Sequence, residues 1–109
     1  MCLLGTENYY DQQADKIKRP MLTQTIIVPN KLGLHARAAA KFATTAARFE
    51  ASIQPGVGSR MVDGKSVMSL MLLAASQGTE LTLITEGDDQ QAAMQALIDL
   101  IEDKFGEGE

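Results

Sequence analysis

The sequence has no tryptophan, two tyrosines, three phenylalanines and a single cysteine. Because Cys2 cannot form an internal disulfide, a disulfide scaffold is excluded, and a reducing compartment such as the cytoplasm is expected. One histidine and one cysteine cannot supply the ligands of a structural zinc, so we expect no metal and no cofactor. No apolar run approaches the roughly 18 residues of a membrane span, so insertion into a membrane is not expected.

Positive charge is scarce and unevenly distributed. The chain has 10 basic and 14 acidic side chains, which gives a formal net charge of −4. Residues 31–65 contain six basic side chains and two acidic ones, whereas residues 66–109 contain one lysine and nine acidic side chains. The overall negative charge argues against binding to nucleic acid. The basic segment suits an anionic ligand or an acidic partner, although a solvated surface with an acidic tail would give the same composition.

The length of 109 residues is that of one domain with one hydrophobic core. Apolar residues make up 45% of the chain and charged residues 22%, as in an ordinary globular protein. Residues 1–20 are polar, end at Pro20 and have no sustained apolar period. We therefore expect them to be an N-terminal extension outside the domain, which would comprise residues 21–109.

Four segments of the domain alternate between apolar and polar residues, a pattern typical of strands with one buried face. These predicted strands are residues 23–28, 49–54, 59–63 and 79–86. The second and third are separated by Pro55-Gly56-Val57-Gly58, which predicts a hairpin turn over residues 55–58.

Three other segments have helical character. Residues 36–48 are rich in alanine, the best helix former, and Ser66 is a favourable N-cap for a short helix over residues 67–73. Asp88 and Gln91 form a capping-box pattern before a third helix. The apolar stripe of this third helix is Met94, Leu97, Ile98, Ile101 and Phe105. The resulting order, β-α-β-β-α-β-α, predicts an α+β fold with three helices on one face of a four-stranded, mostly antiparallel sheet.

The one histidine, His35, lies in the sequence Gly33-Leu34-His35-Ala36-Arg37 at the start of the alanine-rich helix. Amides at a helix N-terminus lack intrahelical acceptors, and the helix dipole adds partial positive charge there. Arg37 falls in the same first turn, so the sequence predicts an anion site that contains an imidazole. We interpret His35 as the acceptor of a phosphoryl group that the amides and Arg37 hold. The alternative is a surface histidine that acts only as an N-cap.

Gly64-Lys65-Ser66 precedes the short apolar helix and invites comparison with a nucleotide-binding loop. A P-loop would need a glycine five residues before Gly64, where this chain has Ser59, so the spacing argues against a small nucleotide-binding protein. A two-turn helix cannot bury all of its nearly continuous apolar residues, so we expect some to be exposed as a partner surface rather than buried in the core. The candidates are Val67, Met68, Met71 and Leu72.

Three segments resemble HPr, the family of histidine-containing phosphocarriers of the bacterial phosphoenolpyruvate-dependent phosphotransferase system. They are GLHARAAAKF at 33–42, GKSVMSLMLL at 64–73 and QGTELTL at 77–83. The resemblance extends in register from about Leu22 to Phe105 and implies an open-faced sandwich fold. One position departs from the family pattern, because Ala38 stands where the family usually has proline.

By this resemblance, His35 is the phosphoryl acceptor, Arg37 stabilises the phosphoryl group, and Ser66 is the target of a serine kinase and phosphorylase. Enzyme I would donate the phosphoryl group and EIIA proteins or domains would accept it, so that the chain is a cosubstrate rather than an enzyme. Both partners need an apolar docking surface beside His35. Its candidates are Leu34, Val67, Met68, Met71 and Leu72.

Two related functions remain open at this stage. A nitrogen-branch phosphocarrier would use the same histidine chemistry to regulate metabolism instead of sugar uptake. A purely regulatory module would act through phosphorylated Ser66 with no carrier role, although the presence of His35 argues against this alternative.

Overall fold

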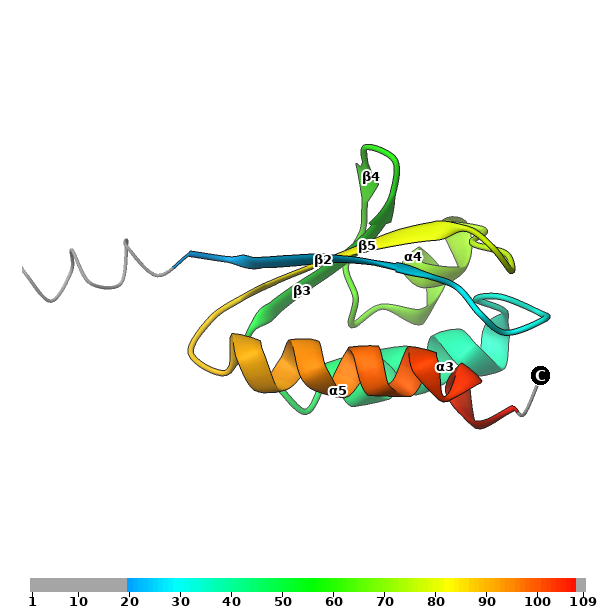
Figure 1. Cartoon of the computed structure of the whole chain (residues 1–109). Coiled ribbons are helices and arrows are strands. Elements are labelled where there is room, and N and C mark those ends of the chain that lie inside the picture. Colours follow the sequence, from blue (N-terminus) through cyan, green and yellow to red (C-terminus); the bar gives the residue numbers. More distant parts are fainter. Residues whose placement is uncertain (1–19, 108–109) are drawn as a thin grey trace, which may run out of the picture.

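The computed structural model describes residues 20–107. The elements in this part of the chain, labelled as in Figure 1, are β2 (Leu22–Ile27), α3 (Ala36–Ala46), β3 (Ser52–Val57), β4 (Arg60–Met61), α4 (Val67–Leu72), β5 (Glu80–Glu86), α5 (Gln90–Glu102) and the short η1 (Lys104–Gly106). Their order confirms the predicted β-α-β-β-α-β-α arrangement. The expected N-terminal extension lies, apart from Pro20, outside the described residues. Within residues 20–107, no helix has the length and apolar character needed to cross a membrane.

The strands form one sheet in the order β2-β5-β3-β4, and every neighbouring pair is antiparallel. In the pairing of β5 with β2, Leu83 is opposite Gln24, and in its pairing with β3, Ile84 is opposite Gln54. Figure 1 shows α3 and α5 beneath the sheet, and α3 also packs against α4. The predicted α+β fold is confirmed, and its sheet is antiparallel throughout.

The core lies between the sheet and the helices. From α3 it contains Ala38, Ala39, Phe42, Ala43 and Ala46, and from α5 it contains Ala93, Met94, Leu97, Ile98 and Ile101. The sheet contributes Ile53, Leu81 and Leu83, whose alternation with exposed or partly exposed neighbours matches the predicted strand faces. Burying each large apolar side chain of this kind stabilises the fold by about 1.5–3 kcal/mol.

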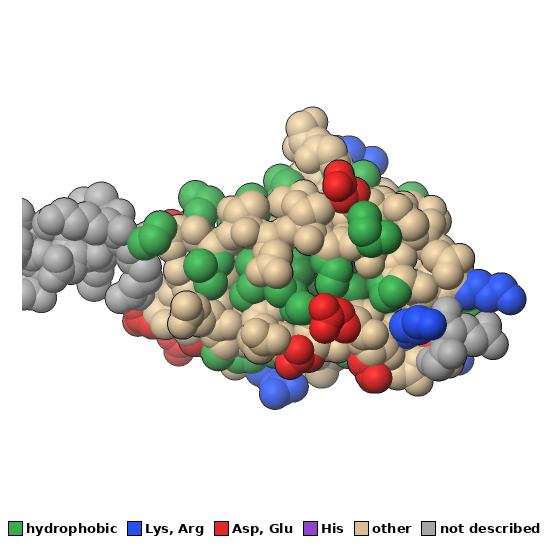
Figure 2. Space-filling model, in the orientation of Figure 1, with side chains coloured by type: hydrophobic (Ala, Val, Ile, Leu, Met, Phe, Trp, Pro, Cys, Tyr) green, Lys and Arg blue, Asp and Glu red, His purple; other side chains and the backbone are tan. Residues whose placement is uncertain are grey.

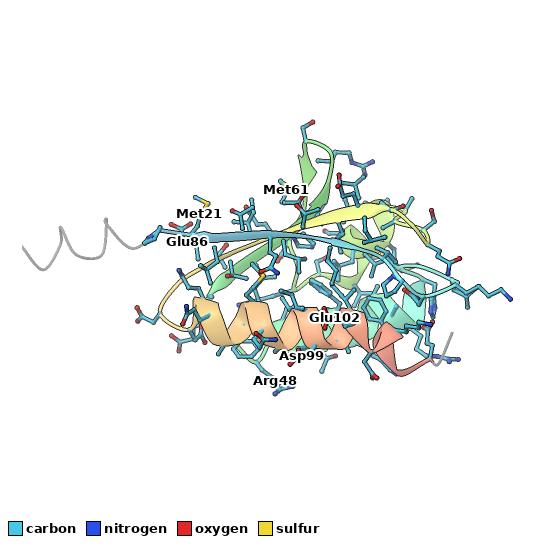
Figure 3. The ribbon with its side chains drawn as sticks, in the orientation of Figure 1. Met21, Arg48, Met61, Glu86, Asp99 and Glu102 are labelled. Carbon is cyan, nitrogen blue, oxygen red and sulfur yellow. The ribbon has the colours of Figure 1, made fainter. Side chains whose placement is uncertain are left out.

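The predicted turn over residues 55–58 is wrong. Pro55 and Gly56 lie inside β3, and the chain turns only at Gly58, which has a φ of 64°. In an antiparallel strand, the N and O atoms of one residue face the same neighbouring strand. Val62 N–H donates to Pro55 O at 2.9 Å, so the nitrogen of Pro55 also faces the β4 side. The pairing of β3 with β4 covers Gly56 and Val57 but does not extend to Pro55. The N–H that proline lacks would therefore lie just beyond the last paired residues of β4. For the same reason β4 is shorter than the predicted strand over residues 59–63 (Figure 3 labels Met61 in the projecting hairpin).

The N-cap position predicted for Asp88 is also wrong. α5 begins one residue later than expected, with Asp89 in the N-cap position. The Asp89 carboxylate accepts from Glu50 N–H at 2.9 Å and from Ala51 N–H at 2.8 Å, which ties the start of α5 to the segment before β3. The Glu50 hydrogen bond is the main reason that the pKa of Asp89 lies below its ordinary value, against the raising effect of desolvation.

The ends of two helices differ from the prediction. α3 ends at Ala46 rather than at residue 48, and α5 ends at Glu102. Phe105 is fully buried, as the apolar stripe predicts, but it reaches the core from the turn after α5. Its φ of 56° is left-handed, so this residue cannot continue a right-handed helix.

The loop between β2 and α3 is held against the segment that follows α4. Gly33 has a φ of 67°, and a Cβ atom at this position would lie 2.3 Å from Ala75 O. Leu34 N–H donates to the same oxygen at 2.8 Å. Glycine is the residue that permits both this dihedral angle and this close approach. Gly33 therefore fixes the loop that leads into α3.

We predict that Gly33→Ala lowers the free energy of unfolding by about 3 kcal/mol or more in a urea titration. Steric overlap with Ala75 is added to the cost of about 1–2 kcal/mol for a left-handed residue with a side chain. Gly58→Ala is the matched control, because its φ is 64° and nothing lies within 4 Å of the added Cβ atom. Equal losses in the two variants would contradict the steric role of Gly33.

Candidate functional site

His35 lies at the junction of the Gly33 loop and α3, where it is the N-cap residue. Its extended backbone, with a φ of −78° and a ψ of 179°, is the usual N-cap conformation. The first intrahelical hydrogen bond runs from Ala39 N–H to His35 O at 2.8 Å, so the amides of residues 36–38 precede it. The imidazole therefore lies beside the positive end of the α3 dipole.

Both ring nitrogens of His35 have a hydrogen-bond partner. The backbone N–H of Arg37 donates to Nδ1 at 3.3 Å. Because an N–H can only donate, Nδ1 carries a lone pair and no proton. Nε2 lies against the carboxylate of Glu107, to which it donates its proton. These partners assign the tautomer in which the lone pair is on Nδ1 and the proton is on Nε2.

The carboxylate of Glu107 is held from a second side by Asn30. Asn30 Nδ2 donates to Glu107 Oε1 at 3.1 Å and to Gly33 O at 2.8 Å, and the Asn30 side chain is fully buried. Burial alone would raise the pKa of Glu107. The hydrogen bonds from His35 and Asn30 and the nearby charge of Arg37 outweigh burial, so this pKa lies below its ordinary value. Glu107 is therefore ionised at neutral pH.

His35 opens into a cleft of about 580 Å³. The cleft is also lined by the cationic side chains of Lys31, Arg37 and Lys41, and by Glu107. Figure 2 shows Lys and Arg side chains at this end of the molecule, on the right of the view. Three cations and one carboxylate give the cleft a net positive charge, which suits an anionic ligand. The structure thus brings the predicted residues His35 and Arg37 into one anion-compatible cleft.

Glu107, Asn30 and Lys41 belong to this site but are not predicted from the sequence. Glu107 is 72 residues from His35 in the chain, and no motif or period connects the two. Lys41 belongs to the basic segment, but its contact is specific: its Nζ donates to Phe105 O at 2.7 Å. The excess of positive charge in residues 31–65 thus indicates a basic region that suits an anion. It does not indicate which group each basic side chain contacts, because tertiary structure decides those contacts.

Ser66 occupies the N-cap position of α4, as predicted. Its side-chain oxygen accepts from Ser69 N–H at 3.2 Å. The preceding Lys65 points away from this helix end, because its Nζ donates to Phe49 O at 2.7 Å. A P-loop joins a strand of a parallel sheet to a long helix, whereas this sheet is antiparallel and α4 has six residues. The fold therefore argues against a P-loop at Gly64-Lys65-Ser66.

Four apolar side chains of α4 are exposed to solvent and form what we call the α4 patch. Their exposed fractions are 37% for Val67, 74% for Met68, 44% for Met71 and 66% for Leu72. Leu70 is the residue of α4 that is buried in the core. The expectation that this helix could not bury all its apolar residues is correct, and flexible methionines are typical of surfaces that bind several partners.

Leu34 is not part of an exposed surface, which corrects its inclusion among the docking candidates. Only 4% of Leu34 is exposed, because its side chain packs in the core. Leu32, two residues earlier, is instead 66% exposed and lines the His35 cleft. The α4 patch lies close to this loop because Leu34 N–H bonds to Ala75 O, three residues after the end of α4.

Comparison with known proteins agrees with this geometry. Residues 22–103 match the family model described as "PTS HPr component phosphorylation site", where PTS denotes the phosphotransferase system. This match spans every element from β2 to α5. The chain belongs to the HPr family of phosphocarriers.

Individual relatives support the family in both sequence and fold. The phosphocarrier protein HPr of Neisseria meningitidis is 52% identical over 89 residues, which are 82% of this chain and 100% of the relative. The crystal structure of an HPr from Thermoanaerobacter tengcongensis has a TM-score of 0.76 and 48% identity, covering 79% of this chain and 97% of that one. The phosphocarrier protein NPr of Shewanella violacea is 40% identical over 86 residues, covering 79% of this chain and 94% of the relative.

Ala38 is the position at which this HPr-family chain departs from the expected proline. α3 nevertheless begins at Ala36, and Ala38 lies in its first turn with a fully buried side chain. Proline is favoured in a first turn because its fixed φ suits the helix and its missing amide is not needed there. Alanine keeps the helix and adds one amide to those that precede the first intrahelical hydrogen bond.

Proposed function

We propose that this chain accepts a phosphoryl group on Nδ1 of His35 from phosphorylated Enzyme I and passes it to a histidine of an EIIA protein or domain. The observation that carries the proposal is the tautomer of His35, whose lone pair is on Nδ1 beside the amides at the start of α3. The Arg37 amide contact at 3.3 Å is long, so it is readily exchanged for a contact with a phosphoryl oxygen.

The transfer is an in-line displacement at phosphorus. The P–N bond of the donor phosphohistidine breaks and its electron pair returns to the donor ring, while the lone pair of His35 Nδ1 forms the new P–N bond. The amides of residues 36–38 and the Arg37 guanidinium stabilise the negative charge on the phosphoryl oxygens. The second transfer repeats these events with His35 as the donor, so the chain ends unchanged and acts as a cosubstrate.

Both partners are proposed to dock on the α4 patch. The patch is near the His35 loop because Gly33 and Leu34 in that loop contact Ala75, which lies three residues after the end of α4. Exposed apolar side chains beside a basic cleft suit a partner that combines an apolar contact area with acidic side chains at its edge. This arrangement would bring the histidine of a docked partner to the opening of the His35 cleft.

A nitrogen-branch role is the second candidate, and the similarity to an NPr at 40% identity supports it. Both branches need the same His35 geometry, so the two functions differ in the partner that docks. Comparing the rate of transfer from the Enzyme I of each branch distinguishes them. The 52% identity to an HPr favours the sugar branch.

We also propose that phosphorylation of Ser66 by a serine kinase, reversed by a phosphorylase, lowers transfer through His35. A phosphate at Ser66 would lie at the N-cap of α4, next to Val67 and Met68 of the α4 patch. Docking would then have to desolvate almost two negative charges beside an apolar surface. A purely regulatory module would need no phosphoryl acceptor, so the cleft around His35 favours the carrier role.

We predict that His35→Ala abolishes labelling by phosphoenolpyruvate and Enzyme I, because His35 is the one histidine in the chain. The label on the wild type should be acid-labile and located on His35 by mass analysis. The free energy of unfolding should fall by no more than about 2 kcal/mol, as for other N-cap exchanges. Label that persists in the variant, or a variant that does not fold, would contradict the assignment.

Arg37→Ala should still be labelled on His35, but more slowly by about 10- to 100-fold, because one charged contact with the transferring group is lost. Arg48→Ala is the matched control. It removes the same charge at a position after α3 where Arg48 lies over the ring of Phe49, on the outer side of the helices in Figure 3. A wild-type rate for Arg37→Ala would show that Arg37 is an ordinary surface charge.

Ser66→Asp should keep the free energy of unfolding within about 1 kcal/mol of the wild type, because aspartate is itself a good N-cap. Its charge beside the α4 patch should raise the apparent KM for acceptance from Enzyme I by at least about tenfold. Ser66→Asn is the uncharged control cap and should behave as the wild type. If Ser66→Asp has unchanged kinetics, the partner docks elsewhere.

A further inference from the structure

The turn after α5 has a backbone that side chains normally disfavour. Lys104 and Phe105 each have a φ of 56°, and Gly106 follows with a φ of 76°. Two successive left-handed residues with side chains cost about 1–2 kcal/mol each. Such a conformation persists only where surrounding contacts hold it.

Those contacts are specific. The Phe105 side chain is fully buried, and Lys41 Nζ, from α3, donates to Phe105 O at 2.7 Å. Within the turn, Gly106 N–H donates to Asp103 O at 2.9 Å and Glu107 N–H to Lys104 O at 3.0 Å. The turn is thus anchored to the core and to α3, and it directs the next residue, Glu107, toward the cleft.

Glu107 reaches His35 with little freedom of movement. One carboxylate oxygen accepts from the buried Asn30, and the other accepts from His35 Nε2. The Glu107 side chain is 11% exposed and that of His35 is 26% exposed, so the contact is partly shielded from water. The order Asn30, Glu107, His35 has the geometry of a carboxylate that orients an imidazole from the side opposite its reacting nitrogen.

We propose that Glu107 is the positioning residue of the phosphoryl acceptor: it holds the Nε2–H of His35, keeps the Nδ1 lone pair directed into the cleft, and stabilises the charge that the ring gains. This inference rests on the proposed phosphocarrier function and adds a residue to it.

The charge follows from the balance of the transfer. Before attack, the His35 ring is neutral, with one proton on Nε2. When Nδ1 forms its bond to phosphorus, the Nε2 proton stays, so the ring becomes a phosphorylated imidazolium cation. The carboxylate of Glu107 faces that cation at Nε2, as the aspartate of a hydrolase triad faces its histidine. Onward transfer of the phosphoryl group returns the ring to its neutral form.

The test compares Glu107→Ala and Glu107→Gln with the wild type in acceptance from Enzyme I. Glu107→Ala removes both the acceptor and the charge, so kcat should fall at least about tenfold with little change in KM. Glu107→Gln keeps an oxygen that accepts from Nε2 but lacks the charge, so its kcat should fall between those of Glu107→Ala and the wild type. Glu102→Gln is the matched control, because it removes one exposed carboxylate at the end of α5 (Figure 3).

A spectroscopic readout separates positioning from a general structural role. The chain has one histidine, so selective ¹⁵N labelling of histidine gives ring signals of His35 alone. The unphosphorylated wild type should show a proton on Nε2 that is shifted downfield and exchanges slowly with water. This signal should persist in Glu102→Gln, weaken in Glu107→Gln and disappear in Glu107→Ala.

The outcomes distinguish this inference from the proposed function. If the wild type is labelled on His35 and both Glu107 variants have wild-type kcat, Glu107 is no positioning residue while the carrier function stands. A higher KM with unchanged kcat would place Glu107 in partner docking and overturn the inference as well. If the wild type itself is not labelled, the proposed function fails, and the inference fails with it.

Discussion

The backbone contact between Gly33 and Ala75 is the constraint on which the geometry of the site depends. It places the loop before α3 directly against the end of the α4 segment, at a distance that no side chain at residue 33 would allow. One hydrogen bond, from Leu34 N–H to Ala75 O, then fixes the direction in which the chain enters α3. As a consequence, His35 caps α3, and the loop that carries it contacts the segment that follows α4. The proposed phosphoryl acceptor and the docking surface proposed for its partners are thus positioned by the same contact.

The two nitrogens of the His35 imidazole lie in opposite electrostatic environments. Nδ1 lies beside backbone amides and the positive end of α3, where an anion is stabilised. Nε2 lies beside a carboxylate that Asn30 holds in place. A phosphoryl group and a ring cation can therefore be stabilised at the same time, each by groups of opposite charge. Carrier chemistry needs this balance, because a phosphoryl group that is held too firmly cannot be passed on.

Some features of the site lie within the region that matches the HPr family, and others lie outside it. The family match covers residues 22–103 and so includes the histidine, the α4 segment and the sheet. Glu107 and the left-handed turn at Lys104–Gly106 lie beyond that match. Ala38 shows the reverse case, since it departs from the family pattern inside the matched region while α3 still begins at Ala36, as the sequence predicts.

Local sequence patterns are enough to predict the type and order of the elements, because alternation, alanine content and the Ser66 cap act between residues a few positions apart. Local sequence also places His35 and Arg37 together, because they lie in a single turn. Tertiary structure alone decided that Pro55 belongs to β3, because the strand that would need its N–H ends beside it. It decided that Asp89 binds the backbone before β3, and that Leu34 is buried. It also brought Glu107 to His35 across 72 residues, because that contact depends on the docking of α5, the burial of Phe105 and the position of Lys41 together. Contacts of this kind have no local pattern, so only the folded chain reveals them.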